Sequence, residues 1–155
     1  MPGFARPALR ITVFRGLPRM SMTRGNPGAL FNSTQYGFSQ AVSAKGSRIV
    51  MTSGQVAWDA DETLTGAGDL YAEASKSLEN VKIALSSLDA RLADVVSLRI
   101  YIVDYKLEES DLISRALKES FPEGEEPAAT WIGVNCLANP DFRIEIEAMA
   151  VVPEA

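Results

Sequence analysis

Histidine is absent from this 155-residue chain, and Cys136 is the only cysteine. Without histidine, Ser-His-Asp and Cys-His nucleophile arrangements cannot be built, and a zinc enzyme is disfavoured. A single cysteine cannot form an internal disulfide, so we expect a reducing compartment, with the cytoplasm as the first choice. The sequence also has no Gly-rich phosphate loop after a strand and no cluster of metal ligands, so no cofactor and no metal are expected.

Long apolar runs are missing as well. Hydrophobic residues make up 46% of the chain, but no run reaches the ~18 residues that a membrane-spanning helix needs. We therefore expect no membrane association. The length fits one folded domain, since single cores typically span about 100–150 residues.

Acidic residues are missing from the first third of the chain. Residues 1–58 contain seven Lys/Arg and no Asp/Glu, whereas residues 59–155 contain all 20 Asp/Glu. We interpret residues 1–25 as a basic N-terminal extension and residues 26–155 as the domain. The extension has two interpretations, a flexible segment or an Arg-rich, acid-poor presequence that would direct the protein to mitochondria. Pro7 and Pro18 interrupt the amphipathic helix that a presequence forms.

Charge also bears on nucleic-acid binding. The basic extension is the only feature that favours it, whereas the net charge of −5 argues against an RNA-binding surface on the domain.

Hydrophobic periodicity predicts the element order strand, strand, helix, strand, helix, strand, strand. Apolar residues at three- and four-residue steps predict helices over residues 69–88 and 108–120. Alternating or β-branched runs predict strands at residues 38–43, 48–53, 95–103, 128–136 and 142–152. This order indicates an α+β fold, a single mixed sheet with two helices on one face.

The other face of such a sheet would remain uncovered. In the last strand Ile144 and Ile146 alternate with Glu145, so the carboxylate points away from the apolar residues. We expect Tyr101 and Trp131 to share the uncovered face with the carboxylates. Such a mixed face is best buried against other subunits.

Four features could contribute to chemistry, and each has a structural alternative. The glycine of Ser53-Gly54-Gln55 admits a close ligand at a strand end, or serves only a turn. Glu145 could position or deprotonate water, or form a charge pair with Arg143.

The other two features are apolar. Ala129 and Trp131 share a strand face and could form a wall for a planar ligand, or Trp131 could be a core or interface residue. Cys136 has no basic neighbour in the sequence and is expected to be a packed apolar residue. Asn80 is expected only on the polar face of the first helix.

In their order and spacing, several segments resemble the Rid/YjgF family, whose founding members hydrolyse reactive imines. The resemblance extends from about residue 28 to residue 152. The segments that carry it are Phe38-Ser39-Gln40-Ala41-Val42, Thr52-Ser53-Gly54-Gln55-Val56, Ser77-Leu78-Glu79-Asn80-Val81, Arg99-Ile100-Tyr101-Ile102-Val103-Asp104 and Arg143-Ile144-Glu145-Ile146-Glu147-Ala148.

The resemblance implies an α+β fold of the chorismate-mutase-like type. It also implies a homotrimer in which three sheets form a central barrel, with small-molecule clefts between subunits. Glu145 would correspond to the glutamate that orients the hydrolytic water, and Ser53-Gly54 to a retained part of the site.

One part of the family pattern is missing. The imine-hydrolysing members have a Pro-Ala-Arg-Ser/Thr motif whose arginine clamps the substrate carboxylate bidentately. Here the stretch is Pro127-Ala128-Ala129-Thr130, so the chain resembles a subgroup that lacks the arginine. Phe38 stands in place of a site tyrosine. Arg99 or Arg143 could supply the missing charge.

The pattern as a whole predicts a homotrimeric hydrolytic deaminase that acts on the C=N bond of an unidentified metabolite other than the usual 2-imino acids. The alternatives are a non-catalytic small-ligand-binding trimer and, less favoured, an RNA-binding protein or ribonuclease. Glu145 is the expected catalytic residue. The expected ligand-binding residues are Phe38, Ser53, Gly54, Ala129, Thr130 and Trp131.

Overall fold

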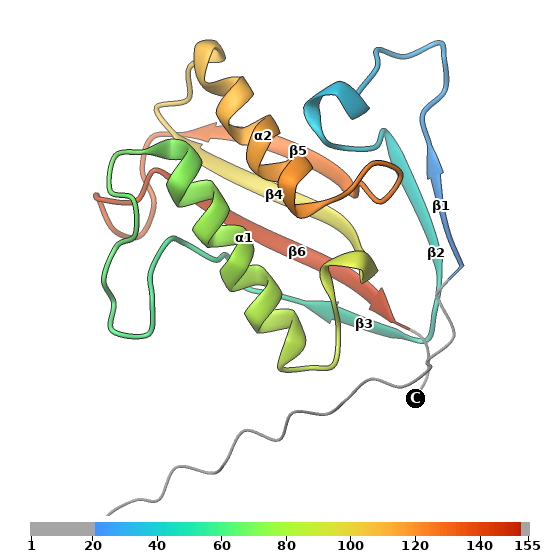
Figure 1. Cartoon of the computed structure of the whole chain (residues 1–155), viewed down its shortest axis with the longest axis horizontal. Helices are drawn as coiled ribbons and strands as arrows, with labels where there is room; N and C mark the ends of the chain where they lie inside the picture. The colour runs from blue at the N-terminus through green and yellow to red at the C-terminus, as the bar shows by residue number, and fades with distance from the viewer. Residues whose placement is uncertain (1–20, 153–155) are drawn as a thin grey trace, which may run out of the picture.

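A four-stranded mixed sheet organises the computed structural model, which describes residues 21–152 (Figure 1). Its strands lie in the order β3 (Arg48–Met51), β6 (Ile144–Val152), β4 (Val95–Val103) and β5 (Ala128–Val134). The β4–β5 pair is parallel and the other two pairs are antiparallel. β3 and β5 are therefore the two outer strands.

Two helices cover one face of this sheet and leave the other uncovered (Figure 1). α1 (Leu70–Ser86) begins at Asp69, whose side chain accepts a hydrogen bond from the Ala72 backbone N–H at 3.1 Å, a favourable N-cap. α2 (Ser110–Ser120) follows the short turn η3 (Leu107–Glu109). Both predicted helices are confirmed.

The core lies between the helices and the sheet. β6 alternates strictly between buried and half-buried residues along its whole length, as a strand with only one face in the core does. Ile146 pairs with Ile100 of β4, and both side chains are almost completely buried. The helices contribute a matching apolar layer, made by Leu70, Ala74, Leu78, Val81, Leu85, Ile113, Ala116 and Leu117.

One carboxylate lies inside this core. Glu73 of α1 is fully buried, and it accepts hydrogen bonds from the backbone N–H groups of Gly68 and Arg143, both at 3.0 Å. A buried carboxylate needs such partners. Glu73 thereby connects the loop before α1 to the residue that precedes β6.

A second, two-stranded sheet lies beside β5 (Figure 1). It consists of β1 (Ser21–Gly25) and β2 (Ala41–Lys45) in antiparallel pairing. The prediction that the first strand, at residues 38–43, belongs to the main sheet is wrong. Only a single parallel bridge, Ser39 to Ala128, joins this region to β5, because the strand starts later than expected and takes β1 as its partner.

The structure describes only part of the predicted N-terminal extension. Residues 21–25 of the expected extension form β1, whereas residues 1–20 lie outside the described residues. The expectation of a flexible segment or presequence, and the domain boundary at residue 25, stay predictions.

Two smaller points complete the fold. The prediction that Cys136 is a packed residue is wrong, because its side chain is exposed after the end of β5. No helix within residues 21–152 combines the length and the apolar character needed to cross a membrane.

We predict that Glu73→Ala lowers the free energy of unfolding by about 2–4 kcal/mol, because two buried backbone N–H groups lose their acceptor. Glu79→Ala is the matched control on the same helix, since Glu79 is exposed and paired only with Lys76, and it should cost less than about 0.5 kcal/mol. Urea unfolding measures both. Equal costs for the two variants would refute the structural role of Glu73.

Candidate functional site

The Glu145 carboxylate lies directly against the backbone of Gly54. A Cβ atom added at residue 54 would overlap Glu145 Oε1 and lie 2.6 Å from its Cγ. Any larger residue at position 54 would therefore push the Glu145 side chain out of this position. Within residues 21–152, the Glu145 carboxylate has no hydrogen bond and no ion pair.

Backbone hydrogen bonds hold Gly54 in this position. The Gln55 N–H donates to the Ile146 carbonyl at 2.8 Å, and the Ile146 N–H donates back to Gln55 at 2.9 Å. Three residues before Gln55, Thr52 exchanges hydrogen bonds with Ala148 through its N–H and its Oγ1, each at 3.0 Å. The segment after β3 thus continues along β6 and carries Gly54 past Glu145.

Asn80 secures the other end of this segment. Its Nδ2 donates to the carbonyl oxygens of Val56 at 2.8 Å and Trp58 at 2.6 Å. The expectation that Asn80 is merely a polar-face residue is wrong. The side chain attaches the loop that follows Gly54 to helix α1. No pattern within the helix itself could indicate this role.

Glu145 points to the uncovered face of the sheet. It pairs in register with Tyr101 of β4. Two residues along the same face is the ion pair between Arg99 and Glu147, whose atoms Nη1 and Oε1 are 2.7 Å apart. Thr130 of β5 lies beside Arg99 on the same face. The expected uncovered face is therefore present, and it carries the carboxylates.

Apolar side chains share that face. Ile49 and Met51 of β3 are each 64% exposed, and they pair with Val151 and Met149 of β6. Exposed apolar residues in adjacent rows form a patch that is unfavourable in water.

Trp131 lies on the opposite, helix-covered face, so its predicted placement beside Tyr101 is wrong. Trp131 pairs with Ile100, and Ala129 pairs with Leu98, and both side chains pack against the core. Alternation along a strand shows which residues share a face, but it cannot show which of the two faces the helices cover.

The Trp131 ring is the centre of an aromatic row. Its centroid lies 6.2 Å from that of Phe38 and 6.5 Å from that of Tyr105. Phe31, 60% exposed, lies 6.2 Å beyond Phe38. The Trp131 Nε1 is buried without a hydrogen-bond partner among the described residues. The rings are tilted by 58° to 89° to one another, so the row is an apolar wall on the face of β5 that also carries Ala129.

The predicted site residues therefore form two groups within one chain. We call Ser53, Gly54 and Glu145 the carboxylate cluster, and Phe38, Ala129 and Trp131 the aromatic cluster. The first lies where β3 ends and the second lies on β5 and the segment bridged to it. Glu145 lies on β6 and points to the uncovered face, whereas Ala129 and Trp131 point to the helix-covered face of β5, so one protomer keeps the two clusters apart.

Both arginines suggested as substitutes for an arginine at position 129 have carboxylate partners. Arg99 faces away from Ala129, and its hydrogen bond with Glu147 raises the pKa of the guanidinium. Arg143 Nη2 lies 2.9 Å from Glu109 Oε1, and this hydrogen bond is the main reason that the pKa of Glu109 is lowered.

The described residues contain no group of three or more His, Cys, Asp or Glu side chains that could hold a metal ion. What the carboxylate cluster does offer is a carboxylate oxygen with free acceptor capacity beside exposed backbone. That arrangement suits the positioning of a water molecule or of a polar ligand hydrogen.

Sequence comparison assigns the family. Residues 32–152 match the sequence profile of the family described as Endoribonuclease L-PSP. The chain belongs to this Rid/YjgF/L-PSP family.

Curated relatives include deaminases that act on imines and enamines. The chain is 33% identical over 105 residues to the 2-iminobutanoate/2-iminopropanoate deaminase of Salmonella typhimurium, a match that covers 66% of this chain and 79% of that protein. It is also 33% identical over 108 residues to the 3-aminoacrylate deaminase RutC of Acinetobacter baylyi, covering 70% of this chain and 82% of the relative.

The fold is that of the family too. The crystal structure of YyfB from Yersinia pestis, a Rid protein of unknown function, superposes with a TM-score of 0.82 at 36% identity, covering 86% of this chain and 100% of that one. The α+β mixed sheet with two helices is thus confirmed.

We predict that Gly54→Ala lowers the free energy of unfolding by about 1–3 kcal/mol, because the new methyl group displaces the Glu145 side chain. In a Glu145→Ala background the same substitution should cost much less, since the clash is gone. A double-mutant cycle by urea unfolding measures this coupling.

Gly28→Ala is the matched control, because a Cβ there meets nothing within 4 Å. A Gly54→Ala cost that is the same with and without the Glu145 side chain would contradict the contact.

Proposed function

We propose that this chain is a hydrolytic deaminase that acts on the C=N bond of a small imine or enamine without the usual carboxylate. The observation that supports this most is the Glu145 carboxylate, which lies against Gly54 with no partner among the described residues. The deaminase relatives point to the same chemistry.

In the proposed reaction, Glu145 is the general base. It removes a proton from a water molecule as the water oxygen bonds to the imine carbon, and the C=N π-electrons move to nitrogen. The same carboxyl group then returns the proton to the nitrogen. Collapse of the carbinolamine forms the carbonyl and releases ammonia, so one water is consumed for each ammonia released.

The substrate class follows from what surrounds position 129. An arginine clamp for a carboxylate is absent there, and losing one charge-assisted hydrogen bond costs about 1.5–3 kcal/mol. The neighbouring rings of Phe38 and Trp131 favour planar or apolar groups. We therefore place the chain in a subgroup that lacks the arginine and takes substrates with a neutral substituent.

The complete site requires a second copy of the chain. We propose a homotrimer in which the β3 edge of one protomer lies beside the β5 edge of the next. The strand end that carries Gly54 would then lie beside the outer strand that carries the aromatic cluster of a neighbour. The exposed Ile49 and Met51 on the uncovered face support burial of this face. Repeated edge-to-edge contact of this kind forms a ring when the rotation between successive copies closes.

A binding protein without catalysis is the second candidate. It is favoured by Ala129 and Phe38, which replace both polar groups of the family pattern. A ribonuclease or RNA-binding role has less support, because the chain's net charge is −5 and phosphate backbones require basic surfaces.

We predict that Ala129→Arg increases ammonia release from freshly generated 2-iminobutanoate by roughly 10- to 150-fold over a weak or absent wild-type rate, the equivalent of the lost interaction. The measurement is coupled ammonia detection after enzymatic generation of the imine. A wild type already as active as the variant would show that another residue binds the carboxylate. If neither the wild type nor Ala129→Arg releases ammonia, the hypothesis of a binding protein without catalysis is favoured.

We also predict that wild type, but not Glu145→Gln, accelerates ammonia release from imines that an amine oxidase generates from arylalkylamines. Glu147→Gln is the matched control, because this glutamate lies two residues along the same face and is paired with Arg99. It should retain activity. Equal loss in both glutamine variants would contradict a specific role for Glu145.

A further inference from the structure

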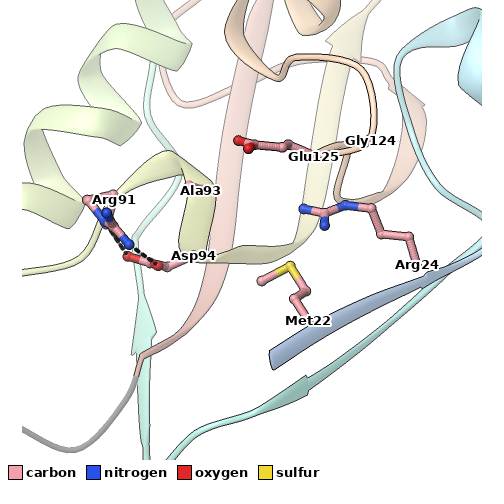
Figure 2. A pocket seen from close by; sticks show the side chains of 7 residues that line it. All are labelled: Met22, Arg24, Arg91, Ala93, Asp94, Gly124 and Glu125. Atoms are coloured by element: carbon pink, nitrogen blue, oxygen red, sulfur yellow. Dashed lines mark hydrogen bonds and ion pairs between the residues drawn. The ribbon is translucent and has the colours of Figure 1, made fainter. Parts of the chain in front are cut away.

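A polar cavity of about 280 Å³ lies between β1, the turn η2 (Leu92–Asp94) and the loop before β5 (Figure 2). It shares no residue with the carboxylate cluster or the aromatic cluster. Three segments far apart in the sequence meet here. The residues that line it are Met22, Arg24, Arg91, Ala93, Asp94, Gly124 and Glu125.

Arg24 is fixed with its guanidinium toward this cavity. Its Nε donates to the Glu126 carbonyl at 3.0 Å, and the same carbonyl accepts from Ser39 Oγ at 2.9 Å. The terminal nitrogens point into the cavity (Figure 2). They have no hydrogen-bond partner among residues 21–152.

The opposite wall is a closed ion pair. Asp94, only 4% exposed, accepts from Arg91 Nη2 at 3.1 Å and from the Arg91 backbone N–H at 2.9 Å. This carboxylate is therefore satisfied and does not compete for a ligand. The pairing with Asp94 is also the main reason that the pKa of Arg91 is raised.

Glu125 supplies an unpaired negative charge. Its carboxylate points into the same space as Arg24 (Figure 2), yet the two form no ion pair within 4.0 Å, and neither has another ionic partner in the described part of the chain. Glu125 also contributes, by charge attraction, to the raised pKa of Arg91, so its negative charge acts on groups that line the cavity.

We propose that this cavity binds a small zwitterionic α-amino acid. The ligand carboxylate would accept two hydrogen bonds from the Arg24 guanidinium, a geometry to which arginine is suited. The ligand ammonium would donate to Glu125, and a short side chain would rest on Met22.

Size and charge favour this ligand class over others. The volume lies just below that of typical ligand pockets, which span about 300–1,000 Å³, so only a very small ligand fits. Two guanidinium and two carboxylate groups line the cavity, so its formal charge is zero. The second negative charge of a phosphate or a dicarboxylate would be repelled by the Glu125 carboxylate. A simple amine would leave the Arg24 guanidinium without a partner. The proposal does not depend on the deaminase activity.

The test is isothermal titration calorimetry on the full chain with glycine and L-serine, compared with acetate and ethylamine at the same ionic strength. We expect the two zwitterions to bind at least 10-fold more tightly than either one-ended analogue. We also expect Arg24→Gln and Glu125→Gln each to weaken glycine binding at least 10-fold. Acetate binding as tightly as glycine, or unchanged affinity in both variants, overturns the proposal.

Two controls keep the result interpretable. Arg115→Gln removes an exposed arginine on α2, paired with Glu119, and should leave glycine affinity unchanged. Arg24→Lys retains the positive charge but cannot donate two parallel hydrogen bonds. Its affinity for glycine should lie between the affinities of the wild type and of Arg24→Gln. Glycine binding that is lost in Glu145→Gln but kept in Arg24→Gln would place the amino acid at the carboxylate cluster and overturn the assignment to this cavity.

Discussion

The contact between the Glu145 carboxylate and the Gly54 backbone is the constraint on which the site depends. The contact exists only with glycine at residue 54, since a Cβ there would displace the carboxylate. It requires the segment after β3 to run along β6, which the paired hydrogen bonds of Gln55 and Ile146 provide. The loop that follows Gly54 must also be held in place. Asn80 does this by donating hydrogen bonds to the carbonyl oxygens of Val56 and Trp58.

The two faces of the sheet carry different candidate residues. β6 buries Ile146 under the helices and turns Glu145 to the uncovered face. β5 turns Trp131 toward the helices, at the far edge from β3. Under the proposed function, the carboxylate and the aromatic wall lie on different faces of one sheet and would meet only when two copies associate. The exposed apolar residues of β3 are consistent with that requirement.

Much of the fold could be predicted because its elements have strong local patterns. β4 coincides with the expected residues 95–103, since a β-branched run with clear alternation has unambiguous ends. β2 was misassigned to the main sheet because its partner, β1, lies in a basic segment without alternation. Which face of β5 carries Trp131 could not be predicted either, because the position of the helices is a tertiary property.

Sequence reasoning names candidate residues for the site but not their arrangement, and the roles of these residues stay predictions. Glu145, Ser53 and Gly54 do come together, yet the reason for the glycine is a side chain some ninety residues away. The function of Asn80 depends on carbonyl groups of a distant loop, so no helical pattern could indicate it. The absence of arginine at Ala129 was visible in the sequence, and the structure adds that Arg99 and Arg143 are both engaged elsewhere.

The claim that the site is shared between copies can be tested without knowing the substrate. In a Cys136→Ser background, Ser53→Cys and Thr130→Cys place thiols beside the two outer strands, too far apart for a bond within one protomer. Mild oxidation followed by non-reducing electrophoresis should yield covalent dimers and trimers, with no higher species. A chain that stays monomeric under the same conditions would contradict a site formed by the β3 edge of one copy and the β5 edge of the next.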